Sequence, residues 1–255
     1  MKIARLSLED GPRFGVYDET TDSYHLLTGD PLYSGIEASG KIVRAQDANL
    51  VAPILPRSKV VAIAGVYGKD STASLENPPL TFLKPNTAVV GPNVPIVEPE
   101  WAGNLHHEVE LAIIISRLCK DVPVERAQDV IFGYTVANDV TDVKTQQTDA
   151  QWARAKGFDT SCPLGPVINT GKDLDLDNLR LTLHIDGELV QEGNTADLAM
   201  SIPEIVAYVS SCFTLLPGDV ILTGAVAPGV AGGPGSEVIA AIEGIGELRN
   251  PVLAS

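Results

Sequence analysis

Short apolar runs separated by turn residues recur along the whole chain, and this pattern restricts the fold more than any other feature. Runs such as KIARLSL (2–8), LTFLK (80–84) and LRLTLHID (179–186) have the length and residue types of β-strands. The last run leads into Asp186-Gly187, a hairpin signal. The 23 glycines and 18 prolines favour many strands and turns over a helical bundle. The sequence therefore predicts a β-rich α+β fold.

The other elements follow from the same pattern. Further strands are expected at residues 13–17, 24–28, 59–64, 107–116, 132–140, 188–191, 218–224 and 237–244. The best helical candidates are residues 124–131, 142–157 and 203–213. Residues 35–50 have the mixed polarity of a connecting helix or loop. Because the first three short strands form a unit of their own, a small N-terminal β-rich domain is predicted over 1–54 and a larger domain over 55–255.

The chain carries a large excess of acidic residues, with 33 Asp and Glu against 18 Lys and Arg and a formal net charge of −15. Neither nucleic acid nor an anionic membrane surface is therefore expected as a partner. No run approaches the ~18 apolar residues of a membrane span, and the start MKIARLSLED lacks the apolar core of a signal peptide. Three separated cysteines without a CxxC spacing indicate neither a disulfide framework nor a zinc ribbon. We expect a cytoplasmic protein.

Two acidic residues stand at the start of the apolar run HHEVELAIII (106–115). Side chains alternate across a strand, so His106, Glu108 and Glu110 are expected on one face. Two ionised carboxylates on a half-buried face repel each other, and burying either one without a partner is costly. A hard divalent cation such as Mg²⁺ would remove both costs, because it prefers oxygen ligands.

Asp139 is a third acidic residue suited to the same site. It follows the apolar strand FGYTVAN, and an acid at a strand end is well placed to face a site. The spacing alone does not decide the matter, because two glutamates on a solvated strand edge give the same pattern. A metal centre and a solvated edge are both open on this ground.

Several stretches together resemble the fumarylacetoacetate hydrolase superfamily over about residues 55 to 253. In family order they are TFLKP (81–85), EVELAIII (108–115), GYTVANDV (133–140), QWARAKGFDTSCPLGP (151–166), LLPGDVILTG (215–224) and IEGIGELRNPV (242–252). Each stretch is weak alone, and their order makes the set specific. The resemblance implies a mixed β-sandwich-like roll with a small N-terminal domain, and a homodimer.

The resemblance also implies a Mg²⁺ or Mn²⁺ ion, with Ca²⁺ as a further candidate, held by Glu108, Glu110 and Asp139. The family's chemistry takes place next to a carbonyl, so a small-molecule carbonyl substrate is expected as the partner. The metal acts as a Lewis acid on the enolate that forms. A lysine that stabilises the developing charge corresponds to Lys156 in AKGFD, and such a lysine can also transfer protons.

The chain departs from the family pattern GxNYxxHxxE, whose histidine and glutamate activate water or move a proton. The corresponding text is AGVYGKDSTASLE (64–76), in which Tyr67 matches as a substrate contact. The histidine position falls on Asp70 and the glutamate position on Ala73. Asp70 is therefore a candidate base, and His106, expected on the ligand face, is a second one.

A second departure follows the metal aspartate, where the family commonly has NDVSARDLQ and this chain has NDVTDVKTQ. An anion-binding arginine becomes Val143, while Gln146 is kept as an implied substrate contact. Thr223 in LLPGDVILTG is a further implied substrate contact. Val143 indicates a ligand with less anionic charge.

Three functions agree with this pattern. The first is metal-dependent C–C hydrolysis or decarboxylation of a 1,3-dicarbonyl or 2-oxo acid through a stabilised enolate. The second is a non-hydrolytic cyclase, tautomerase or hydratase of a specialised biosynthetic pathway on the same scaffold. The third is a pseudoenzyme that binds a ligand without turnover. The missing His/Glu dyad keeps all three open.

Overall fold

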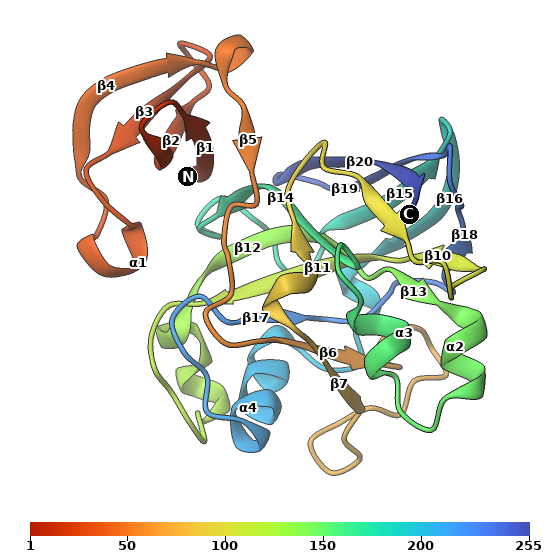
Figure 1. The fold of residues 1–255 in the computed structure, drawn as a ribbon. Helices are drawn as coiled ribbons and strands as arrows, with labels where there is room; N and C mark the ends of the chain where they lie inside the picture. Colours follow the sequence, from red (N-terminus) through yellow and green to blue (C-terminus); the bar gives the residue numbers. More distant parts are fainter.

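A computed structural model describes residues 1–255 and shows a strand-rich α+β protein (Figure 1). Its strands form sheets of twelve, three and five strands. The predicted β-rich fold class is confirmed. None of the helices combines the length and the apolar character that a membrane crossing requires.

The N-terminal unit is a small antiparallel sheet. Its elements are β1 (Lys2–Leu8), β2 (Gly11–Asp18), β3 (Ser23–Leu27), α1 (Pro31–Ser34), β4 (Ala38–Arg44), the 3₁₀ turn Ala45–Asp47 and β5 (Leu50–Val51). The predicted connecting segment at 35–50 is thus largely a strand, because β4 pairs with β3 at the edge of the sheet. The predicted domain boundary, between residues 54 and 55, lies in the segment that connects β5 to the next strand, which begins at Val60.

The rest of the chain supplies further strands of the large sheet and all strands of the two smaller sheets. Its strands are β6 (Val60–Ala64), β7 (Leu80–Lys84), β8 (Val89–Val90), β9 (Ile96–Glu98), β10 (Leu105–His107), β11 (Val109–Ile115), β12 (Ile131–Asn138), β13 (Thr141–Asp142), β14 (Cys162–Asn169), β15 (Arg180–Ile185), β16 (Glu188–Asn194), β17 (Val220–Leu222), β18 (Val230–Ala231), β19 (Glu237–Ile242) and β20 (Gly246–Ala254). Its helices are α2 (Val143–Thr148), α3 (Ala153–Gly157) and α4 (Ile202–Cys212), with 3₁₀ turns at Asn86–Ala88, Val124–Val130 and Thr195–Asp197.

The large sheet runs in the order β4-β3-β2-β1-β14-β12-β11-β17-β6-β7, so it passes from the N-terminal unit into the rest of the chain. The strand pairing that joins the two parts of this sheet is short: β1 pairs with β14 at only two positions, Lys2 with Asn169 and Ile3 with Ile168. The five-stranded sheet, β16-β15-β19-β20-β9, packs over the large one, and the short β13-β10-β18 sheet lies beside the site.

Strand β11 is the centre of the core. All seven of its residues are buried, and it is hydrogen-bonded between β12 and β17. Such complete burial explains why VELAIII reads as a nearly continuous apolar run. Helix α4 covers the sheet with Ile205, Val206 and Val209, and a capping box between Ser201 and Glu204 fixes where it begins.

The predicted strand 107–116 is two strands, which is the difference that matters most for the site. Strand β10 pairs with β13 and β18, whereas β11 pairs with β12 and β17, and Glu108 stands between them. The change of partners interrupts the strand at Glu108. The predicted helix 142–157 is likewise split into α2 and α3.

A buried ion pair joins the turn before β17 to the residues just before β6, and it leads to a prediction about stability. Asp219 is fully buried, and its carboxylate accepts hydrogen bonds from Ser58 Oγ at 2.7 Å, Lys59 Nζ at 2.6 Å and the Leu216 N–H at 3.0 Å. Asp219→Ala leaves these donors without an acceptor, so we expect the free energy of unfolding to fall by about 3 kcal/mol in urea titrations. Asp129→Ala, which removes an exposed pair with Arg126, is the control and should change stability little. A loss no larger than the control's would contradict the prediction.

Candidate active site

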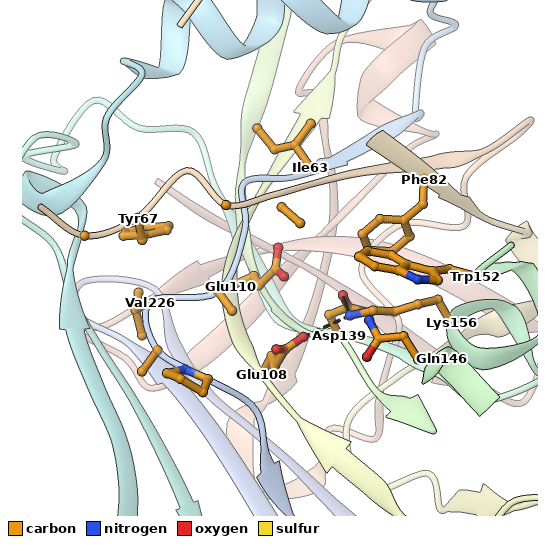
Figure 2. Close-up of a pocket in the computed structure, with 16 residues that line it drawn as sticks. Ile63, Tyr67, Phe82, Glu108, Glu110, Asp139, Gln146, Trp152, Lys156 and Val226 are labelled. Atoms are coloured by element: carbon orange, nitrogen blue, oxygen red, sulfur yellow. Dashed lines mark hydrogen bonds and ion pairs between the residues drawn. The ribbon is translucent and has the colours of Figure 1, made fainter. Parts of the chain in front are cut away.

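A cavity of about 480 Å³ opens beside the carboxylates at the junction of β10 and β11 (Figure 2). Its lining residues come from several segments of the chain. They are Ile63, Ala64, Gly65, Tyr67, Gly68, Phe82, Glu108, Glu110, Asp139, Gln146, Trp152, Lys156, Ala225, Val226, Ala227 and Pro228. Figure 2 shows Phe82 and Trp152 on one side of the carboxylates and Tyr67 and Val226 on the other.

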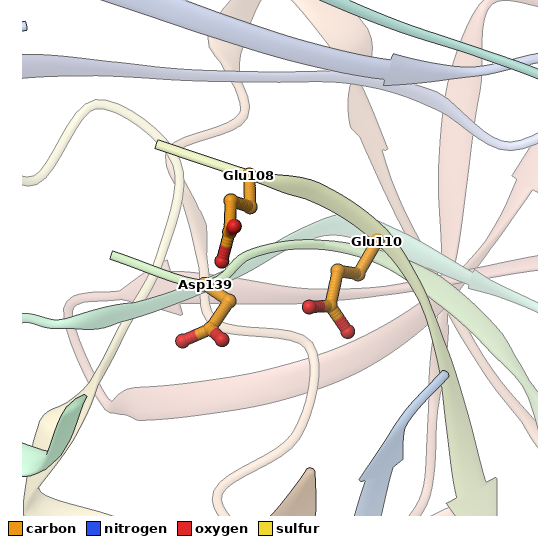
Figure 3. A group of neighbouring side chains, drawn as sticks. All are labelled: Glu108, Glu110 and Asp139. Atoms are coloured by element: carbon orange, nitrogen blue, oxygen red, sulfur yellow. The ribbon is translucent and has the colours of Figure 1, made fainter. Parts of the chain in front are cut away.

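Three carboxylates converge in this cavity from two neighbouring strands (Figure 3). One oxygen each of Glu108, Glu110 and Asp139 lies within 4.8 Å of the other two. Glu110 and Asp139 are buried, and Glu108 is half-buried. The two glutamates come from adjacent positions on one face, and Asp139 follows the last residue of β12.

The backbone around Glu108 is held by a buried hydrogen-bond chain. The Glu108 N–H donates to Asn138 Oδ1 at 3.2 Å, and the Asp139 N–H donates to the Glu108 carbonyl at 2.9 Å. Asn138 Nδ2 lies 3.1 Å from His107 Nδ1, and His107 Nε2 lies 2.9 Å from the Gly232 carbonyl. Burial lowers the pKa of His107 to about 4, so this imidazole is neutral and donates through Nε2. His107 therefore holds the backbone segments that carry Glu108 and Asp139 in place.

Glu110 depends on a glycine for its one protein hydrogen bond. The Gly224 N–H donates to Glu110 Oε2 at 2.7 Å. Gly224 has φ +92°, and a Cβ there would lie 2.6 Å from Val66. Only glycine fits this backbone path without strain.

Two ammonium groups grip Asp139, one at each oxygen. Lys156 Nζ is paired with Asp139 Oδ2 and lies 2.9 Å from Glu108 Oε2. On the other side, Lys84 Nζ lies 2.8 Å from Asp139 Oδ1. The ring of Phe82 lies below Lys156, with its centroid 5.0 Å from Nζ.

The charges shift the acidities in opposite directions. Burial raises the pKa of Glu110 well above its usual range, and the neighbouring Asp139 and Glu108 raise it further. Burial also raises the pKa of Glu108, although Lys156 opposes the shift. Burial alone would raise the pKa of Asp139, but the ammonium groups of Lys156 and Lys84 outweigh it and hold that pKa below its usual range. Asp139 is thus the firmly ionised member, and Glu110 is the carboxyl group whose ionisation is opposed most strongly.

The chain matches a known protein family over most of its length. The sequence profile described as "Fumarylacetoacetate (FAA) hydrolase C-terminal" matches residues 60–253. The chain belongs to the fumarylacetoacetate hydrolase family. A second profile, "Rv2993c-like, N-terminal", matches residues 1–53.

Similar proteins in the fumarylacetoacetate hydrolase family are enzymes of several kinds. Protein Rv2993c of Mycobacterium tuberculosis is 42% identical over 99% of this chain and 98% of its own. The mitochondrial oxaloacetate tautomerase FAHD1 of Pongo abelii is 38% identical over 71% of this chain and 84% of its own.

Two solved structures share the fold over the full length of both chains. The 5-carboxymethyl-2-hydroxymuconate delta-isomerase of Mycobacterium smegmatis is 41% identical with a TM-score of 0.93. The maleylpyruvate hydrolase of Sphingobium sp. SYK-6 is 29% identical with a TM-score of 0.82, and its structure contains manganese(II) and pyruvate.

The carboxylates of this family member suit a hard divalent cation. Their oxygens are the ligands that Mg²⁺ and Mn²⁺ prefer, and they are close enough to share one ion. No ammonium group is paired with Glu110, so three carboxylates share only two ammonium groups. Glu108, Glu110 and Asp139 are the residues that would hold the ion.

Not every expected site residue reaches the cavity. Tyr67 and Gln146 line it, and the buried Tyr67 hydroxyl has no hydrogen-bond partner. Asp70 is exposed on the loop beyond Gly68 and does not line the cavity. The side chain of His106 is tied elsewhere, with Nδ1 2.8 Å from the Gly229 carbonyl.

Thr223 lies behind the site. Its hydroxyl donates to the Leu111 carbonyl at 3.0 Å, and the side chain is fully buried in the sheet. Val143, which stands where the family has an anion-binding arginine, begins α2 and does not line the cavity.

The sequence reading missed the second ammonium group and the apolar wall. Lys84 ends the strand LTFLK, and its place in the stretch TFLKP was the available signal. Phe82 and Trp152 lie edge to face with centroids 5.6 Å apart, and Val226 and Pro228 line the cavity from a loop. Nothing in the local sequence distinguishes these apolar residues from core residues.

Proposed function

We propose that this protein is a divalent-metal-dependent enzyme that interconverts the keto and enol forms of a 2-oxo acid. The observation that carries the proposal is a cavity with three converging carboxylates and one ammonium group but no histidine or further acid. Mg²⁺ or Mn²⁺ is the proposed cofactor. When bound, the ion would supply Lewis-acid stabilisation of the enolate that forms next to the substrate carbonyl.

Lys156 supplies the chain's own positive charge. Its ammonium lies between Glu108 and Asp139, and these carboxylates raise its pKa above the usual range although burial opposes the shift. Such a group stays protonated and acts on a developing oxyanion through its charge and hydrogen bonds. Tyr67 also lines the cavity, and its hydroxyl is buried.

Proton transfer fits the cavity better than hydrolysis does. Tautomerisation needs one group that takes a proton from a carbon and returns a proton to an oxygen, which a single carboxylate of the cavity can do. C–C hydrolysis also needs an activated water and a proton for the leaving carbon. The candidate acid–base residues Asp70, Glu76 and His106 do not line the cavity. The relatives named as a tautomerase and an isomerase are also closer in sequence, at 38% and 41% identity, than the hydrolase at 29%.

Hydrolysis is the second candidate, and the loop after β6 favours it. Gly65, Tyr67 and Gly68 line the cavity, so Asp70 lies two residues from its wall. A single assay separates the two reactions. Proton NMR in D₂O with a 2,4-dioxo acid and Mn²⁺-free Mg²⁺ buffer should show enzyme-dependent deuterium exchange at C3 without release of pyruvate. Release of pyruvate at the rate of exchange would favour hydrolysis. If neither exchange nor pyruvate release occurred, the result would favour a protein that binds a ligand without turnover.

The wall of the cavity predicts the kind of substrate. Lys156 is the only basic side chain that lines it, and Ile63, Phe82, Trp152 and Val226 form apolar surface. A second carboxylate on the substrate would have no cation to pair with, which is costly in a partly dry site. We expect kcat/KM for a 2,4-dioxo acid with an alkyl end to exceed that for oxaloacetate by about tenfold or more, a difference of about 1.4 kcal/mol. Equal or higher turnover of oxaloacetate would contradict this prediction.

A further inference from the structure

Lys84 is a fully buried lysine that the proposed chemistry does not use. It ends β7, and 0% of its surface is exposed. Its Nζ donates to the carbonyl oxygens of Ser161 at 2.8 Å and Val140 at 3.2 Å, and to the Lys156 carbonyl. It also lies 2.8 Å from Asp139 Oδ1. No part of the side chain lines the cavity.

These contacts connect the two halves of the site. Asp139 and Val140 directly follow β12, whereas Lys156 lies in the last turn of α3 and Ser161 precedes β14. One ammonium therefore holds the carboxylate of Asp139 and the backbone of Lys156 at the same time. The Lys156 side chain then reaches back to Asp139 Oδ2.

We propose that Lys84 is a positioning residue, which fixes one oxygen of Asp139 and the backbone of Lys156 so that the other oxygen and the Lys156 ammonium face the cation site. The proposal rests on the proposed metal site. It concerns the geometry of the ligand and not the reaction, so it is tested by metal binding even if the substrate is different. Hydrogen-bond partners of metal ligands typically change affinity by about 10–100-fold when removed.

The test is the variant Lys84→Met, which keeps the apolar stem and removes the ammonium. Calorimetric titration with Mn²⁺ alone should show affinity reduced by about 10–100-fold. The matched control is Lys59→Met, which removes another lysine paired with a buried aspartate, Asp219, outside the cavity. Both variants should melt at lower temperature, but only Lys84→Met should lose affinity.

The direction of the change separates positioning from simple charge. If Lys84 acted only as a nearby positive charge, its removal would strengthen cation binding. A gain in affinity, or an unchanged affinity at lowered melting temperature, would therefore overturn the proposal. Lys84→Gln, which keeps two N–H donors, is the second variant if Lys84→Met does not fold, and it should show a smaller loss. Failure of both variants to fold would make Lys84 a folding residue and would also overturn the proposal.

If the unmodified chain did not bind Mn²⁺, the proposed metal site itself would be contradicted. This outcome differs from failure of the Lys84 proposal, because it is seen in the unmodified chain and needs no variant.

Discussion

Changing both Glu108 and Glu110 to glutamine in one variant is expected to abolish Mn²⁺ binding in calorimetric titrations up to millimolar metal. The two side chains supply two of the three converging carboxylates, and a hard cation is held chiefly by the charge and number of such oxygens. Turnover should be lost with the ion. The control is the double change Glu76→Gln and Glu125→Gln, which removes two exposed carboxylates outside the cavity. Unchanged affinity in the Glu108/Glu110 variant would place the ion elsewhere.

The single change Glu110→Gln provides a test that measures stability and does not depend on activity. The pKa of Glu110 is raised by burial and by the neighbouring carboxylates, so the folded metal-free chain holds this proton more tightly than the unfolded chain does. The stability that comes from this proton is fully present below the usual glutamate pKa of about 4.3 and is lost as the pH rises through the raised value. Glutamine removes the ionisation, so the metal-free variant should be more stable than the parent at alkaline pH and similar to it in acid. Equal stability at all pH values would contradict the buried charge.

Lys156→Met should lower kcat by on the order of 10²–10³, because one preorganised cationic group is removed from beside the enolate oxygen. The metal-free variant should also lose about 3 kcal/mol of stability, because two partly or fully buried carboxylates lose their shared partner. A bound divalent cation supplies the missing charge, so added Mn²⁺ should restore much of this stability. Melting temperature with and without Mn²⁺, together with steady-state kinetics, measures both effects.

Lys144→Met is the matched control for Lys156→Met. Lys144 is an exposed lysine on the neighbouring helix α2 and does not line the cavity. Its removal should leave stability and kcat nearly unchanged. Full activity in Lys156→Met would place that lysine outside the chemistry, and a loss confined to KM would give it a role in binding alone.

Strand positions were predictable where local pattern and burial agree. Residues 80–84 form a strand with the predicted bounds, and Val109–Ile115 is buried throughout, as its apolar run indicates. Strands β14 and β20 were missed because they contain Pro163, Pro166 and Pro251, which lower the local strand preference. Their pairing with distant strands overrides that preference, and no local pattern carries this information.

The candidate site shows the same division. The carboxylates of Glu108, Glu110 and Asp139 were found from alternation and from a strand end, and they do converge. Lys156 was expected from resemblance as a lysine presented from a loop, whereas the structure buries it in an ion-pair cluster. The burial depends on Asp139, which is distant in sequence. Asp70 matched a motif position only by alignment, and the path of its loop leads it away from the cavity.

The ion-pair cluster has a consequence for the order in which ligands bind. When all three carboxylates are ionised, they and the two ammonium groups give the metal-free site one net negative charge, which repels an anionic substrate. A divalent cation reverses that sign and leaves one positive charge, enough to balance a single carboxylate. An anionic substrate should therefore bind more tightly after the metal than before it, and calorimetric titration with a 2-oxo acid should give a lower Kd with Mg²⁺ present than without it.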